Sequence, residues 1–425
     1  MLSRRHFIVG SAAAVATFRN DTISKLISIE PSLWLSPEDI AKDEGYWTKV
    51  RAAFDIEESF LYLNNGGICP APRSVRAAEQ AYMDQAAKAP AYYIYRKQEP
   101  RIEEVRKRLA KLFKASPDEI AVMPNASQGL FTAVMGTPMV QGDVVVTTNQ
   151  DYPRIITAIK QRERRDRITP KVLTVPEIPP STDAILASLS SALTLKPKLV
   201  CIPRVGYLNG TVFPAKEIVD QFRGIGTLTL VDGAHAIGQL PDTAASVGSD
   251  FYACCLHKWI LGPTGSGFLY VRKDHIPNIW PLNPADESLD KDIRKFEQFG
   301  TRNSGILLAV LEALDAHEAI GQERKSARLV YLRKYLSDAL KKIPGLEFGS
   351  ALSPELGRAL LAVRLPNIQA GTLATWLMSK HKIFVTTTKV GSFEGIRITP
   401  QIFTSLPELD RFIGAMTSAV KDGLG

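Results

Sequence analysis

The feature that most constrains the fold is a regular alternation of short apolar runs and helical segments over residues 100–232. Parallel strands need a crossover connection, usually a helix, whereas antiparallel strands can be joined by a tight turn. The alternation therefore predicts an α/β fold with a mostly parallel, doubly wound sheet covered by helices on both faces. The expected strands are residues 119–123, 143–148, 171–175, 198–203 and 227–232, and the expected helices are 100–113, a segment after Asn125, 153–164, 182–193 and 215–222.

The order of elements changes in the C-terminal part of the chain. Helical periodicity extends over residues 306–343 and is interrupted at Gly321. Beyond Pro344 the expected elements are a strand at 360–365, a helix at 370–381, two strands at 383–388 and 395–400, and a closing helix at 406–421. This pattern predicts a smaller α+β C-terminal domain. The expected division is a leader (1–18), an arm or linker (19–60), a large domain (61–317) and a small domain (318–425). With 425 residues, 45% of them hydrophobic, the chain can bury a large core.

The first residues differ from the rest of the chain. Residues 3–8 read SRRHFI, a twin-arginine pattern, and an apolar stretch of small residues leads to a possible cleavage signal at residues 14–16. Charge, apolar run and small-residue site in this order are typical of an export signal, and the stretch is too short to span a bilayer. The alternative is an incidental arginine pair at a frayed terminus. We expect export by the twin-arginine machinery to the periplasm, without a stable membrane anchor.

Charge and cysteine content exclude several classes of protein. The net charge is +8, and the densest basic run, residues 160–167, is interrupted by Glu163 and Asp166. Without interleaved aromatic residues or a nucleic-acid motif, this run indicates a solvated helix face, and no nucleic-acid partner is expected. The four cysteines are too few and too irregularly spaced for a disulfide scaffold or a metal site. Cys254 and Cys255 lie in an apolar run and are expected to be buried thiols.

Two residues, Asp232 and Lys258, indicate which kind of cofactor the chain could bind. Asp232 ends an expected strand, and Lys258 follows an apolar run and precedes the Gly-rich segment 262–267. A lysine amine can form a Schiff base with pyridoxal 5′-phosphate, and an aspartate paired with the pyridine nitrogen keeps the ring able to take up electrons. Alone, Lys258 would be a surface lysine and Asp232 a turn residue. Together they predict a pyridoxal phosphate site at the carboxyl ends of the strands.

Other residues are candidates for binding the cofactor or the substrate. His235 and His257 neighbour the two residues above, although either could be an ordinary core histidine. Ser127 and Gln128 begin a helix, where backbone N–H groups favour a phosphate, although a plain N-cap would look the same. Further candidates are Tyr152 for ring stacking and Arg397 for a substrate carboxylate, with packing and an edge-strand arginine as the alternatives. Residues 64–67 (NNGG), Asn65 among them, could border the substrate pocket or form a plain turn.

The chain resembles class V members of the aminotransferase superfamily, which are fold-type I pyridoxal phosphate enzymes. Within this class it is most similar to isopenicillin N epimerase-like proteins. It is also similar to an exported pyridoxal phosphate enzyme that tailors the siderophore pyoverdine. The resemblance rests on YLNNGGICPAP (62–72), NASQGL, DGAHAIGQ, HKWILGPTGSGFLYV, FGTRN (299–303) and RITPQIFTSLPELDRFI. The DGAHA and HKW pair is the most specific part.

The resemblance implies an aspartate aminotransferase-like large domain and a role for each matching residue. It implies Lys258 as the cofactor-bearing lysine, Asp232 as partner of the pyridine nitrogen and His235 near the phenolic oxygen. Ser127, Gln128 and His257 would contact the phosphate, Tyr152 would stack on the ring, and Arg397 would hold a carboxylate. It further implies a homodimer in which Gly300 and Thr301 reach the phosphate of the neighbouring subunit.

The chain departs from the family pattern in three ways, and the first is the expected export, because members of the family are mostly cytoplasmic. Relatives commonly carry Thr-Asn or Ser-Asn before a Gly-x-x-x-Pro turn, whereas this chain has residues 204–207 (RVGY), so Tyr207 or the shifted Asn209 would replace the asparagine. The C-terminal region contains no cysteine, which disfavours the persulfide chemistry of cysteine desulfurases.

The predicted function is that of a periplasmic pyridoxal phosphate-dependent enzyme acting at the α-carbon of an amino acid, or of an amino-acid moiety of a peptide, as an epimerase or aminotransferase. Lys258 would move the proton at that carbon. The first alternative is oxidative decarboxylation or other tailoring of a peptide siderophore side chain. The second, non-enzymatic alternative is a binding protein that retains the cofactor on the same fold.

Overall fold

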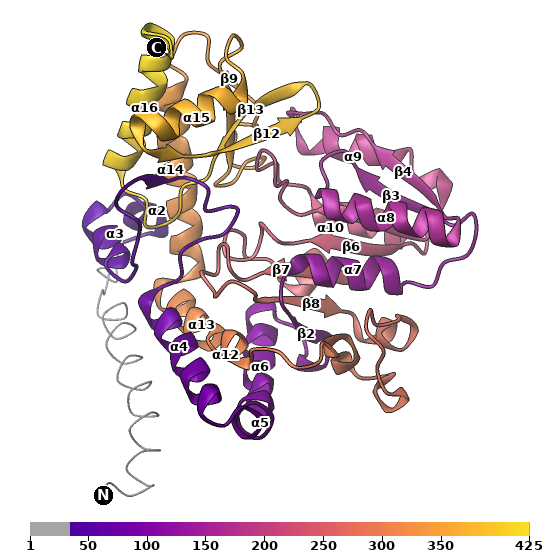
Figure 1. Ribbon diagram of the computed structural model, residues 1–425. Helices are drawn as coiled ribbons and strands as arrows, with labels where there is room; N and C mark the ends of the chain where they lie inside the picture. Colours follow the sequence, from indigo (N-terminus) through magenta and orange to yellow (C-terminus); the bar gives the residue numbers. More distant parts are fainter. Residues whose placement is uncertain (1–34, 425) are drawn as a thin grey trace, which may run out of the picture.

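A seven-stranded sheet forms the centre of the larger part of the molecule in the computed structural model, which describes residues 35–424 (Figure 1). The strand order is β2-β8-β7-β6-β5-β3-β4, and only β8 runs antiparallel to the others. The strands are β2 (Ile120–Met123), β3 (Val144–Thr148), β4 (Thr169–Leu173), β5 (Leu199–Pro203), β6 (Leu228–Asp232), β7 (Phe251–Cys255) and β8 (Gly267–Val271). The predicted mostly parallel α/β sheet is confirmed.

Helices cover both faces of this sheet because successive strand residues point to opposite sides. Val200 and Ile202 of β5 belong to one core, with α6, α9, α10 and α13, whereas Leu199 and Cys201 belong to the other, with α7 and α8. The helices around the sheet are α4 (Arg73–Lys88), α5 (Pro90–Tyr93), α6 (Ile102–Phe113), α7 (Ala126–Gly136), α8 (Pro153–Asp166), α9 (Thr182–Ser190), α10 (Ala215–Arg223), α11 (Ala244–Val247), α12 (Ser304–Leu308) and α13 (Val310–Ile320).

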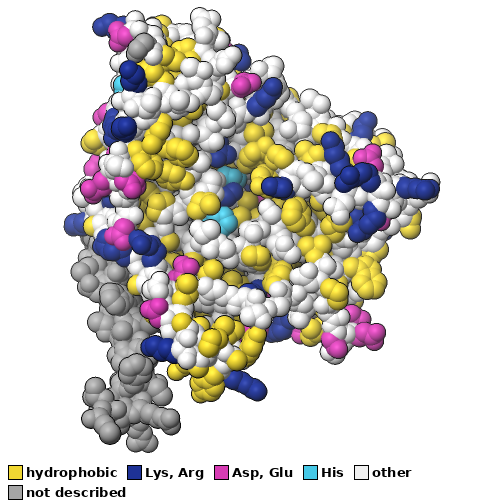
Figure 2. Space-filling model, in the orientation of Figure 1, with side chains coloured by type: hydrophobic (Ala, Val, Ile, Leu, Met, Phe, Trp, Pro, Cys, Tyr) yellow, Lys and Arg dark blue, Asp and Glu magenta, His cyan; other side chains and the backbone are white. Residues whose placement is uncertain are grey.

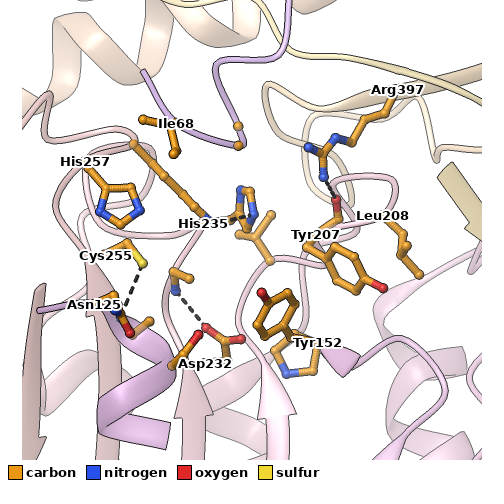
Figure 3. Close-up of a pocket in the computed structure, with 18 of the residues that line it drawn as sticks. Ile68, Asn125, Tyr152, Tyr207, Leu208, Asp232, His235, Cys255, His257 and Arg397 are labelled. Carbon is orange, nitrogen blue, oxygen red and sulfur yellow. Dashed lines mark hydrogen bonds between the residues drawn. The ribbon is translucent and has the colours of Figure 1, made fainter. Parts of the chain in front are cut away.

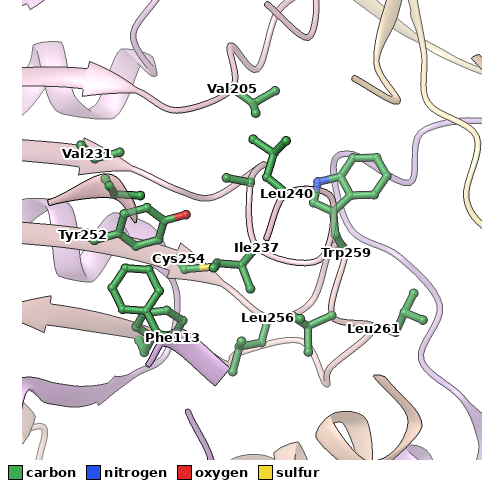
Figure 4. Close-up of a cluster of buried hydrophobic side chains, with 14 of the residues drawn as sticks. Phe113, Val205, Val231, Ile237, Leu240, Tyr252, Cys254, Leu256, Trp259 and Leu261 are labelled. Atoms are coloured by element: carbon green, nitrogen blue, oxygen red, sulfur yellow. The ribbon is translucent and has the colours of Figure 1, made fainter. Parts of the chain in front are cut away.

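The first of these cores continues past the sheet into the loop that follows Cys255. Trp259 is fully buried there beside Ile237 and Leu240 (Figure 4). Gly238 approaches this loop so closely that a Cβ atom on it would lie 2.6 Å from the carbonyl carbon and oxygen of Trp259. Gly238 also has a φ of +91°, which glycine adopts without strain. The loop that carries Lys258 is therefore packed as tightly as the core itself.

The C-terminal part forms a four-stranded antiparallel sheet of order β12-β13-β10-β9. One face of this sheet shares a core with the helices α14, α15 and α16. Gly321, with a φ of +89°, separates α13 from the long helix α14, as the sequence predicts. The expected strand 383–388 is split, because residues 383–384 pair with β1 and residues 386–390 pair with β13. The elements are α14 (Gln322–Leu340), β9 (Glu347–Phe348), β10 (Leu361–Arg364), α15 (Ala370–His381), β11 (Ile383–Phe384), β12 (Thr386–Val390), β13 (Phe393–Ile398) and α16 (Leu406–Lys421).

The segment before the large sheet packs mainly against the C-terminal elements. Helices α2 (Pro37–Ile40) and α3 (Glu44–Arg51) lie beside α14 (Figure 1). Strand β1 (Leu61–Tyr62) pairs in parallel with β11. The domain limits 61–317 and 318–425 stay predictions, and the twin-arginine leader lies outside the described residues. Within residues 35–424, no helix combines the length and apolarity needed to cross a bilayer, and no cluster of potential ligands suits a metal ion.

Candidate active site

A cavity of about 510 Å³ opens where the carboxyl ends of the parallel strands meet the C-terminal sheet (Figure 3). Figure 2 shows histidine side chains in the hollow between the two parts of the molecule. Asp232 ends β6 and Cys255 ends β7, while Tyr152 and Lys258 follow β3 and β7, so one sheet edge supplies residues far apart in the sequence. The predicted site residues in the cavity wall are Ser127, Tyr152, Asp232, His235, His257, Lys258 and Arg397.

Lys258 lies next to His235 inside this cavity. The Lys258 Nζ atom is 3.0 Å from His235 Nε2. Burial lowers the pKa of His235 well below its usual range, and the positive charges of Lys258, Arg397 and His257 lower it further. His235 is therefore a neutral imidazole at neutral pH, and its Nε2 atom can accept a hydrogen from the lysine amine.

Asp232 is buried at the floor of the cavity. Its Oδ1 atom accepts a hydrogen bond of 2.9 Å from the Ala234 N–H group. Burial raises the pKa of the Asp232 carboxyl above its usual range, and the Ala234 N–H group and the charge of Lys258 oppose that rise only in part. A cation against this carboxyl would restore its ionised form.

The amino end of α7 faces the same cavity. Asn125 caps this helix, since its Oδ1 atom accepts a hydrogen bond of 2.9 Å from the Gln128 N–H group. Ser127 lines the cavity, and the Cys255 sulfur accepts a hydrogen bond from the Ala126 N–H group. His257 lies at this side (Figure 3), and burial lowers its pKa to about 4. The helix end and these side chains offer hydrogen-bond donors to an anion.

Arg397 on β13 forms the opposite wall. It donates from NH1 to the Tyr207 carbonyl at 2.5 Å and from NH2 to Asn64 Oδ1 at 2.8 Å. Both acceptors are neutral, and the Nε atom is buried without a partner among residues 35–424. Burial lowers the pKa of Arg397 to about 10, so its guanidinium is still charged at neutral pH. A buried cation without an anionic partner favours an anionic ligand.

Two tyrosines meet beside Asp232 and Arg397. The rings of Tyr152 and Tyr207 are in edge-to-face contact, with centroids 5.5 Å apart (Figure 3). Of the two candidates to replace the missing asparagine, Tyr207 lines the cavity. Asn209 does not, since its amide donates to the Glu177 and Gly349 carbonyls and its oxygen accepts from Thr211.

Four predicted site residues lie outside the cavity wall. Asn65 is fully buried and donates to the Thr399 carbonyl at 2.9 Å, so its side chain holds β1 to the C-terminal part. Gln128 contributes its backbone N–H group to the Asn125 cap. Gly300 and Thr301 are exposed, and Thr301 Oγ1 lies 2.8 Å from the Tyr95 hydroxyl. Their expected contact with a neighbouring subunit stays a prediction.

Gly66 and Gly67, from the segment predicted to border the substrate pocket, enter the cavity wall through the loop after β1. Sequence reasoning missed their neighbour Ile68, and it also missed Thr386, Thr387 and Thr388 of β12. The Thr-rich strand carries no motif, and its position depends on its pairing with β13. Asn64, the contact of Arg397, adjoins Asn65 in the predicted segment, but the sequence does not indicate which of the two faces Arg397.

Comparison with known proteins identifies the family. Residues 61–394 match the family model of aminotransferase class-V, which covers more than half of the chain. The chain belongs to this family. The isopenicillin N epimerases of Streptomyces clavuligerus and Amycolatopsis lactamdurans are 25% and 27% identical to it, over 87% and 88% of this chain and 97% and 99% of theirs. The apo cysteine desulfurase of Thermococcus onnurineus NA1 shares the fold, with a TM-score of 0.77 at 22% identity over 88% of this chain and 98% of its own.

Pyridoxal 5′-phosphate is the cofactor of this class V family, as predicted. The cavity residues fit it. The Nδ1 atoms of His235 and His257 are buried without a hydrogen-bond partner among residues 35–424. The buried Asp232 carboxyl suits a protonated ring nitrogen, the amino end of α7 suits a phosphate, and the Lys258 amine opens into the same space.

Proposed function

We propose that this protein is an exported enzyme that uses pyridoxal phosphate to move a proton at the α-carbon of an amino acid or of an amino-acid moiety of a peptide. The observation that carries the proposal is that Lys258, Asp232 and Arg397 line one cavity. An amine, a buried acid and a buried guanidinium are the groups needed to attach the cofactor, to hold its ring nitrogen and to orient a substrate carboxylate. Epimerase chemistry is supported further by the likeness to isopenicillin N epimerases.

The bound cofactor draws electrons from the substrate α-carbon and so acidifies its C–H bond. Lys258 Nζ accepts the proton from one face of this carbon, and epimerisation requires that a proton then reach the opposite face from a second donor. His235, neutral and 3.0 Å from Lys258, orients the amine and accepts its hydrogen. Arg397 holds the carboxylate, and Tyr152 and Tyr207 exclude water from the side of the cavity next to Arg397.

Cysteine desulfurase chemistry is not favoured, although such enzymes share the fold. Cys255 is the cysteine in the cavity wall, and burial raises the pKa of its thiol. A protonated thiol is a poor nucleophile. The C-terminal region contributes no cysteine at all.

Two experiments test the proposal. Borohydride treatment of the holoenzyme, followed by peptide mapping, should place the reduced cofactor on Lys258. The Lys258→Ala variant should lose this attachment, and its rate should fall by roughly 10²–10⁴-fold.

The second experiment is incubation of the enzyme with free amino acids and with peptide siderophores in D₂O, which separates the possible reactions by the mass of their products. Deuterium uptake together with an inverted α-carbon, read by chiral chromatography, indicates epimerisation, exchange of the amine for oxygen indicates transamination, and mass loss indicates decarboxylation. A Lys258→Ala protein that retains the cofactor, and a wild type that exchanges no α-proton, would instead support a cofactor-retaining binding protein.

Export and dimer formation are separate parts of the proposal. The support for export is the SRRHFI pattern at residues 3–8, and the support for a dimer is the family resemblance around Gly300 and Thr301. Cell fractionation of the wild type and of a variant with Arg4→Lys and Arg5→Lys tests export, which requires the variant to stay in the cytoplasm. Sedimentation of the holoenzyme tests the dimer.

A further inference from the structure

Each of the three backbone carbonyls around Lys258 accepts a hydrogen bond from a distant part of the chain. The Cys69 N–H group donates to the His257 carbonyl at 3.0 Å, and Gln401 Nε2 donates to the Lys258 carbonyl at 3.4 Å. Lys325 Nζ donates to the Trp259 carbonyl at 2.6 Å. The donors come from the loop after β1, the loop after β13 and helix α14, so the tertiary structure fixes this backbone from three directions.

Lys325 is an unusual residue for this position. Its side chain has 0% exposure, and among residues 35–424 it forms no ion pair with a carboxylate. Its other contact is His317 Nδ1 at 3.0 Å, and burial lowers the pKa of Lys325 to about 7. Burying an amine without a counter-ion is costly. An apolar side chain would attach α14 to the large sheet at a lower cost in free energy, so packing alone does not account for Lys325.

The other two donors connect Lys258 to the walls of the cavity. Gln401 lies just beyond β13, which carries Arg397, and Gln401 Nε2 also donates to the Cys69 sulfur at 3.4 Å. Cys69 directly follows the cavity-lining loop 66–68. A shift of any of these segments would therefore be transmitted to the backbone of Lys258. On the remaining side Gly238 lies against Trp259, which leaves this backbone no room to relax.

We propose that Lys325 is a positioning residue of this enzyme: together with Gln401 and the Cys69 amide, it fixes the backbone of residues 257–259 and so the direction from which the Lys258 amine reaches the cofactor and the substrate α-carbon. This inference rests on the role of Lys258 proposed above. Lys325 itself touches neither substrate nor cofactor.

The test is Lys325→Met, which keeps the length and removes the donor. The matched control is Lys334→Met on the same helix, an exposed lysine that pairs with Asp338. For each holoenzyme we would measure the pH midpoint of the cofactor absorbance change, the circular dichroism of the cofactor band, kcat, KM and the melting temperature. We expect Lys325→Met to shift the midpoint and reduce the dichroic band, and to lower kcat by roughly 10- to 100-fold with little change in KM. Lys325→Gln, which restores one donor, should recover part of the loss, and Lys334→Met should match the wild type.

Two outcomes contradict the inference. If Lys325→Met keeps the wild-type midpoint, dichroism and kcat while its melting temperature falls, Lys325 only stabilises the fold. If Lys325→Met does not fold, Gln401→Leu removes the donor to the Lys258 carbonyl, and a wild-type midpoint and kcat in that variant contradict the inference equally. Failure of the proposed function is recognised separately, because borohydride treatment of the wild type would then leave no reduced cofactor attached to Lys258.

Discussion

The Lys258 Nζ atom and the His235 Nε2 atom lie 3.0 Å apart inside the cavity. Because burial keeps His235 neutral, the contact does not place two positive charges side by side at neutral pH. The same imidazole has its Nδ1 atom buried without a partner among the described residues. His235 thus orients the amine through one nitrogen and keeps the other available to a ligand.

The first prediction concerns the carboxylate contact of Arg397. Arg397→Lys replaces a planar pair of donors by a single ammonium, so we expect KM for an amino-acid substrate to rise roughly 10- to 100-fold, with a smaller change in kcat. Steady-state kinetics measure this. Arg364→Lys on β10, which pairs with Glu347 outside the cavity, is the control and should leave KM unchanged. An equal KM in both variants would exclude Arg397 as a carboxylate contact.

The second prediction separates stability from activity at Asp232. Burial raises the pKa of this carboxyl in the cofactor-free protein, so ionisation of Asp232 is unfavourable in the folded state. Asp232→Asn should therefore stabilise the apoprotein at pH 8, while the holoenzyme loses roughly 10²–10³-fold of its rate because the ring nitrogen loses its acidic partner. Urea unfolding of the apoprotein and holoenzyme kinetics measure the two effects. A variant that loses stability and retains its rate would contradict the assigned role.

The third prediction is a pH dependence of stability at His257. Its pKa is about 4 in the folded protein, against 6.5 as the ordinary value, so between these pH values the unfolded state binds more protons. Stability is therefore lost as the pH falls from 6.5 towards 4, by roughly 2 kcal/mol at pH 5. His257→Asn removes this contribution. The difference in unfolding free energy between pH 7 and pH 5 should be smaller by that amount in the variant, and equal differences would refute the prediction.

The fourth prediction tests the close packing of the Lys258 loop. A Cβ atom on Gly238 would overlap the Trp259 backbone, in addition to the strain of a φ of +91°. Gly238→Ala should destabilise the protein by roughly 2–4 kcal/mol, measured by urea unfolding. Gly226 has a φ of +80° and open space around it, so Gly226→Ala carries the backbone strain alone, about 1 kcal/mol. Equal losses would show that Trp259 moves aside freely.

The sequence predicted the parallel sheet and placed Asp232 and Lys258 at one edge of it. Both predictions rest on local signals, because strand and helix periodicities are properties of neighbouring residues and parallel strands end at a common edge. The expected strand 383–388 was wrong in detail, since its two halves pair with different partners, β1 and β13. Such a division depends on contacts between residues far apart in the chain.

Asn64 and Asn65 show where local information ends. The sequence presents two adjacent asparagines, and only the pairing of their segment with Thr399 turns Asn65 inward and leaves Asn64 to contact Arg397. Lys325 is a further case, since nothing near it in the sequence distinguishes it from Lys334, the exposed lysine of the same helix. The amino-acid sequence by itself determined the fold class, the cofactor and seven of the side chains that line the cavity: Ser127, Tyr152, Asp232, His235, His257, Lys258 and Arg397. Only the tertiary structure decided which side chains complete the cavity and hold Lys258 in place, because these contacts join segments that are from 66 to 333 residues apart.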